Sequence, residues 1–88
     1  MPPTRKDRIE AALRQGLQPT RLEIRDDSAK HRGHAGASPE GETHFHVIIA
    51  SPRFQGIKPV ERQRMMYALL KAEMESGLHA LSVEALEA

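Results

Sequence analysis

Histidine is the residue type in this sequence that is best suited to metal chemistry. The chain carries five histidines, which are His31, His34, His44, His46 and His79, and it has no cysteine. A neutral imidazole nitrogen can bind iron, and two histidines replace two thiolates in some [2Fe–2S] centres. Because the chain offers no thiolate, an iron–sulfur or other soft-metal site would need sulfur from a second molecule.

His79 follows Gly77 at the point where a predicted helix gives way to a short strand. Its parity matches that of Leu81 and Val83, which favours a partly buried packing histidine. Its position at the rim of the sheet favours a ring that solvent can reach. The pattern alone puts packing ahead of a functional role.

The other histidines lie in two segments. His44 and His46 alternate with apolar residues in a predicted strand, so we expect both on the open face of the sheet. Their spacing suits a metal pair, but no third ligand lies between them, and exposed polar strand residues are the commoner explanation. His31 and His34 lie in a glycine-rich loop of about fifteen residues, and a loop that long is often functional.

The order of the predicted elements is α-β-β-α-β. Thr4 is a plausible N-cap for the first helix, and Gly16 is expected to end it. The predicted elements are a helix over about 5–15, a strand over about 20–26, a loop over 27–41, a strand over 42–50, a helix over about 60–75 and a strand over 78–83.

This order predicts one α+β domain over residues 1–88, with a three-stranded mixed sheet and its two main helices on one face. The first two strands should be antiparallel, and the last two parallel with a right-handed crossover. The core should include the residues Phe45, Val47, Ile49, Met66, Tyr67, Leu70 and Met74. The tail over 84–88 is expected to form a helical turn or to fray.

Composition narrows the function classes. The formal net charge is +1, from 13 basic and 12 acidic side chains, whereas dedicated duplex binders usually carry a much stronger basic bias. The sequence shows no cysteine nucleophile, glycine-rich phosphate cradle or serine elbow, so we expect no enzyme activity. No apolar run has the length of a membrane span and no secretory signal is evident, so we expect a cytoplasmic protein.

Three segments carry a family resemblance. They are ETHFHVIIAS with the following RFQG, ERQRMMYALL, and GLHALSV. In this order and at about this spacing they resemble the BolA-like family, whose fold is a class-II KH-like α+β domain. The family usually has Arg-His-Arg at the start of the second long helix, and this chain has Arg62-Gln63-Arg64 there.

The resemblance implies that His79 is a metal ligand and that a loop histidine is a second one. His34 fits the loop motif of the histidine-loop branch better than His31, and the choice between them stays open. The implied partner is a monothiol glutaredoxin, which brings a thiolate and glutathione to a bridging [2Fe–2S] cluster. The implied role is iron–sulfur cluster trafficking or iron and redox regulation. Imidazole must lose its proton to bind metal, so the assembly should weaken at acid pH.

Two other functions stay open. The first is a KH-like nucleic-acid-binding transcriptional regulator that contacts phosphate through Arg53, Lys58, Arg62 and Arg64. The low net charge opposes it, and so does the lack of a Gly-x-x-Gly loop, of which Gly56 supplies one glycine. The second is a small adaptor without a metal. The free protein is expected to be a monomer or a weak homodimer.

Overall fold

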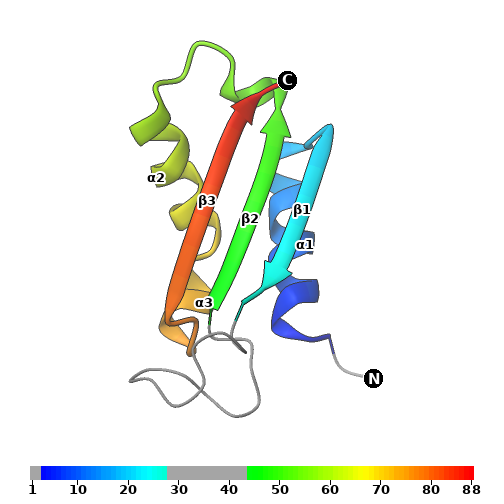
Figure 1. Cartoon of the computed structure of the whole chain (residues 1–88), viewed down its shortest axis with the longest axis vertical. Coiled ribbons are helices and arrows are strands. Elements are labelled where there is room, and N and C mark those ends of the chain that lie inside the picture. Colours follow the sequence, from blue (N-terminus) through cyan, green and yellow to red (C-terminus); the bar gives the residue numbers. More distant parts are fainter. Residues whose placement is uncertain (1–2, 28–43) are drawn as a thin grey trace.

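The computed structural model describes residues 3–27 and 44–88, and these segments form one sheet with helices on one of its faces (Figure 1). The elements in chain order are α1 (Arg5–Leu17), β1 (Arg21–Asp26), β2 (His44–Ser51), the 3-10 turn η2 (Pro52–Phe54), α2 (Pro59–Leu69), α3 (Lys71–Glu75) and β3 (Ala80–Glu87). In the described part of the chain, no helix is both long enough and apolar enough to span a membrane.

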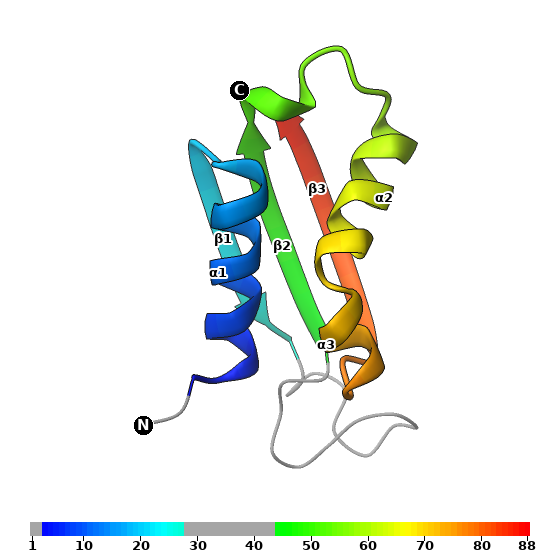
Figure 2. The same cartoon turned by 180° about the vertical axis from the view of Figure 1, so that it is seen from behind.

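The sheet is mixed, as the sequence predicts. β2 is the central strand and pairs antiparallel with β1 and parallel with β3. In the view from behind, β3 lies to the right of β2 and the helices lie in front of the sheet, which makes the crossover right-handed (Figure 2). The predicted α+β architecture is therefore confirmed.

The core lies between the sheet and the helices. Alternation along β2 directs Phe45, Val47 and Ile49 towards the helices, as predicted. The residues of the core that are 3% exposed or less are Ile9, Leu13, Leu17, Phe45, Val47, Ile49, Phe54, Met66, Leu70 and Leu78. Burial of these side chains is the main favourable term for a domain without disulfides.

The start of α1 follows the prediction, but its end does not. Thr4 and Asp7 form a reciprocal capping box: Asp7 N donates to Thr4 Oγ1 at 3.2 Å and Thr4 N donates to Asp7 Oδ2 at 3.0 Å. The helix continues through Gly16 to Leu17, and the left-handed cap residue is Gln18, with φ of 48°. The prediction that Gly16 ends this helix is wrong.

Gly16 instead lies where α1 and α2 approach each other. A Cβ atom built on Gly16 would lie 2.7 Å from Leu69 Cδ2, too close for an ordinary contact. The absence of a side chain therefore lets Leu69 pack directly on the backbone of α1. At the end of the same helix, the buried Ser51 hydroxyl donates to Leu17 O at 2.5 Å.

The second helical segment, predicted as one helix over about 60–75, is divided. Leu70 has φ of −104° and ψ of 14° and separates α2 from α3. The sequence has no proline or glycine at this point, so the pattern gives no signal for the break. Tyr67, which was expected in the core, is exposed, and its hydroxyl donates to Leu81 O at 2.9 Å.

β3 is longer than the predicted strand over 78–83. It pairs with the whole of β2, from Ala80 opposite His44 to Glu87 opposite Ser51. The prediction that the tail over 84–88 forms a helical turn or frays is wrong for residues 84–87, because they extend the parallel pairing. Edge strands usually leave backbone groups unpaired, and here Tyr67 and Arg62 bond the Leu81 and Ala85 carbonyls.

The contact between Gly16 and Leu69 can be tested by a double-mutant cycle. Gly16→Ala should stabilise a Leu69→Ala variant by about 0.5–1 kcal/mol, because alanine favours the helix and nothing opposes its methyl group. In the wild-type background the methyl group meets Leu69, so the gain should be smaller or become a loss. Urea denaturation of the four proteins measures the coupling. Equal effects in both backgrounds would contradict the packing role of Gly16.

Candidate functional site

His79 and His44 lie together at one end of the sheet. His79 directly precedes β3, and His44 is the first residue of β2, opposite Ala80 in the parallel pairing. The centres of the two imidazole rings are 5.4 Å apart, and the ring planes are tilted by 53°. The fold therefore joins two histidines that come from distant parts of the sequence.

The two rings differ in their exposure. His79 is exposed, because residue 79 lies before the strand and its parity does not fix the direction of its side chain. His44, which was expected on the open face, is only 8% exposed. The pairing of β1 with β2 continues past the end of β1 here, since Asp27 N donates to His44 O at 2.8 Å. The backbone at the start of β2 is thus bonded to the residue that follows β1.

A shallow hollow of about 180 Å³ lies beside His44. The residues that line it are Asp27, His44, Phe45, Ala80, Leu81 and Ser82. The Asp27 carboxylate accepts a hydrogen bond from Arg25 Nε at 2.9 Å. Within residues 3–27 and 44–88, no three side chains are grouped to hold a metal ion, so a metal bound here would take further ligands from elsewhere.

The turn that carries His79 is fixed by Arg5, from the first turn of α1. Arg5 Nη1 donates to Glu73 O at 2.9 Å and to Ser76 Oγ at 3.1 Å, and Nη2 donates to Ser76 O at 3.2 Å. A guanidinium group at the end of a helix satisfies carbonyls that have no partner within the helix. Gly77, with φ of 132°, lies against the same guanidinium group.

Glu73 completes this connection between the two ends of the chain. Its carboxylate accepts hydrogen bonds from Arg8 Nε and Nη2, both at 3.0 Å, and from Arg5 Nη1 at 3.3 Å. Its side chain is only 13% exposed. Leu78, the residue before His79, is buried and its N–H donates to Glu73 O at 2.9 Å. The backbone on the N-terminal side of His79 is therefore anchored, while its ring is exposed.

The two predicted loop histidines belong to the segment between β1 and β2. His34 and His31 lie outside the described residues. The pairing of His79 with either of them, which the family resemblance implies, stays a prediction.

The four cations proposed for phosphate contact have different environments. Arg62 is 13% exposed and donates to Ile57 O at 2.6 Å, Ala85 O at 3.1 Å and Glu87 Oε1 at 2.7 Å. It connects the turn before α2 to the end of β3. Arg53, Lys58 and Arg64 are exposed; Arg53 bonds Gln18 Oε1 at 3.2 Å and Arg64 pairs with Glu61.

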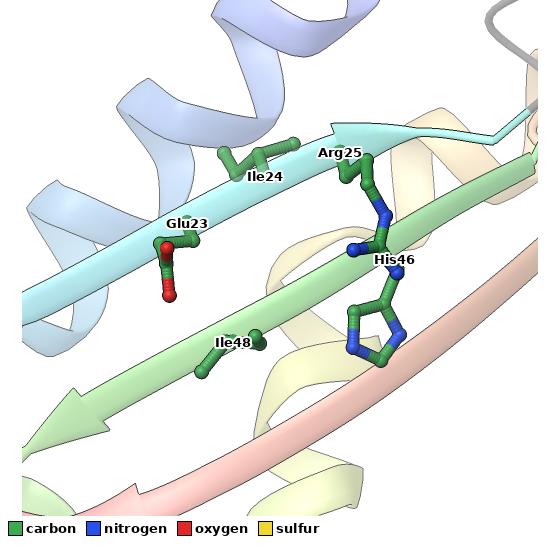
Figure 3. A pocket seen from close by; sticks show the side chains of 5 residues that line it. All are labelled: Glu23, Ile24, Arg25, His46 and Ile48. Carbon is green, nitrogen blue, oxygen red and sulfur yellow. The ribbon is translucent and has the colours of Figure 1, made fainter.

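The open face of the sheet carries a separate hollow of about 340 Å³. Glu23, Ile24, Arg25, His46 and Ile48 line it. The side chain of Arg25 extends from β1 across to His46, and the His46 ring points onward towards β3 (Figure 3). His46 Nε2 also lies 3.6 Å from Glu84 Oε2. His46 thus belongs to a cluster of charged side chains on the open face of the sheet. Its neighbours differ from those of His44.

The anchor of the His79 turn can be tested by removing the Glu73 carboxylate. Glu73→Ala should lower the free energy of unfolding by about 1–2 kcal/mol, because two arginines lose a charged acceptor at a largely buried position. Glu75→Ala is the matched control: its pair with Lys71 is exposed, so its loss should cost under about 0.5 kcal/mol. Urea denaturation measures both variants. Equal losses would show that the Glu73 network is an ordinary surface feature.

Comparison with known proteins gives the family. A family model described as BolA-like protein matches residues 13–88. Protein BOLA1, chloroplastic, from Arabidopsis thaliana is 44% identical over 81 residues, which cover 90% of this chain and 51% of that protein. SufE-like protein 1, chloroplastic/mitochondrial, from the same plant is 48% identical over 82 residues, which cover 89% of this chain and 22% of that protein. The chain thus spans about half of the first relative and about one fifth of the second.

Solved structures agree with this result. The structure of BolA1 from Arabidopsis thaliana has a TM-score of 0.87 and 37% sequence identity, and the match covers 98% of this chain and 94% of that one. Together, the family match over residues 13–88, the sequence identities and the shared mixed α+β fold show that the chain belongs to the BolA-like family.

Proposed function

We propose that this protein partners a monothiol glutaredoxin and ligates a bridging [2Fe–2S] cluster through His79. A loop histidine, His34 or alternatively His31, would be its second ligand. The role of the complex would be iron–sulfur cluster trafficking or iron and redox regulation. The observation that carries the proposal is the exposed imidazole of His79 on an anchored turn, in a member of the BolA-like family.

The side chains of this protein fit the role of supplying a minority of the ligands of such a cluster. The chain has imidazoles and no thiolate, whereas [2Fe–2S] clusters are bound mainly by thiolates and by two histidines in some centres. The sulfur ligands would therefore come from the glutaredoxin and the glutathione that it carries. The protein would act as a binding partner and not as an enzyme.

The cellular location stays a prediction. The sequence predicts the cytoplasm, while the two Arabidopsis relatives have names that place them in chloroplasts or mitochondria. A cluster partner would be useful in any of these compartments. The proposal for His79 does not depend on which of them is correct.

The proposal is tested by mixing the protein with a cluster-loaded monothiol glutaredoxin. The visible absorption and circular dichroism spectra should change, because an imidazole replaces another ligand of the cluster. His79→Ala should abolish this change, and His46→Ala, on the open face of the sheet, should retain it. His34→Ala and His31→Ala identify the loop ligand. If wild-type protein forms no complex and leaves the spectra unaltered, the proposal is wrong.

Nucleic-acid binding is the second candidate function, and the exposure of Arg53, Lys58 and Arg64 near the start of α2 favours it. Arg62 is a weaker candidate than the sequence suggests. Its guanidinium group already bonds two carbonyls and a carboxylate. A phosphate contact would compete with these bonds.

The two roles of these cations can be separated. Arg62→Ala should lower the free energy of unfolding by about 1–3 kcal/mol, because two partly buried carbonyls lose a charged donor. Lys58→Ala and Arg64→Ala should change stability little. If they contact phosphate, each should reduce the salt slope of DNA binding by about 1. Urea denaturation and fluorescence anisotropy at several salt concentrations measure these effects. If DNA binding is weak at low salt and neither Lys58→Ala nor Arg64→Ala changes it, nucleic-acid binding is excluded as the second candidate function.

A further inference from the structure

The geometry of His44 and His79 points to a metal site in the free protein. Two imidazoles on one tetrahedral ion have nitrogens about 2.0–2.1 Å from the metal, which puts ring centres about 3.2 Å from it and about 5.2 Å from each other. The observed separation of the ring centres is 5.4 Å, with planes tilted by 53°. We propose that these two residues chelate one divalent cation of the Zn²⁺ type without any partner protein.

The backbone at or beside each histidine is held in place before a metal arrives. His44 lies at the start of the central strand, with its carbonyl bonded to Asp27 N and its backbone paired opposite Ala80. His79 is fixed between buried Leu78 and the first residue of β3. A site whose ligands are already positioned loses little conformational freedom when the ion binds.

The surroundings allow an ion to enter and complete its coordination. The exposed ring of His79 and the hollow of about 180 Å³ that His44 lines give access from solvent. Residues 3–27 and 44–88 provide no third grouped ligand, so the two imidazoles would be the ligands that this part of the chain contributes. A site built on two imidazoles favours Zn²⁺, Co²⁺, Ni²⁺ or Cu²⁺ over Mg²⁺ or Ca²⁺, which prefer oxygen.

This inference differs from the proposed function in its second ligand and in needing no cluster. An aromatic pair without any metal also has ring centres 4.5–7 Å apart, so the experiment must distinguish chelation from simple packing. It must also distinguish His44 from the loop histidines.

The test is a titration of the ¹⁵N-labelled protein with Zn²⁺, followed by long-range ¹H–¹⁵N spectra of the imidazoles. Ring nitrogens of His44 and His79 should shift together and reach saturation at one equivalent, and Mg²⁺ should have no effect. Calorimetry should show that His79→Gln and His44→Gln each weaken Zn²⁺ binding at least tenfold. His46→Gln is the matched control and should leave the affinity unchanged.

Several outcomes would overturn the inference. They are a shift of His79 with His34 or His31 while His44 stays unchanged, a shift of His79 alone, and weak shifts of all five histidines without saturation. Retained affinity in a folded His44→Gln protein would also overturn it. If His44→Gln unfolds, the spectra of the wild-type protein decide the question. The assay contains no glutaredoxin and no cluster, so its result is independent of the proposed function.

Discussion

The structure depends on the bonds between the guanidinium group of Arg5 and the end of α3. A cation that is largely shielded from solvent is costly unless it is paired and hydrogen-bonded, and here Nη1 and Nη2 of Arg5 bond backbone carbonyls, a hydroxyl and the Glu73 carboxylate. The bonds join the first helix to the turn before the last strand. That turn determines where β3 begins and where His79 presents its ring. The start of the chain thus controls the geometry of a residue close to its end.

The alternation of apolar and polar residues predicts most of the sheet. Phe45, Val47 and Ile49 face the helices, and the strand order and directions follow from the lengths of the connections. Predictions from local sequence patterns were wrong where a distant residue determines the local structure. Gly16 accommodates Leu69 of another helix, and residues 84–87 become a strand because β2 offers them a partner. Arg5 and Glu73 have no sequence spacing that would reveal their bond.

In the candidate site, too, some features could be predicted from the sequence and others depend on distant residues. The family resemblance singles out His79, and its exposure fits that role. The proximity of His44 could not be predicted, because alternation assigns that residue to the open face and says nothing of the turn that brings His79 beside it. For Arg62, the sequence suggested a functional surface cation. In the structure its guanidinium group instead connects α2 to β3 through hydrogen bonds.

The place of the last residue has a practical consequence. Gln55 Nε2 donates to Ala88 O at 3.2 Å, so the carboxyl end lies beside η2, at the opposite end of the sheet from the histidine pair (Figure 1). α1, in contrast, starts at the histidine end, where Arg5 reaches Ser76. A fluorophore or purification tag joined to Ala88 would therefore leave the imidazoles accessible. An oligohistidine tag at the amino terminus would lie near them and could capture the same cation.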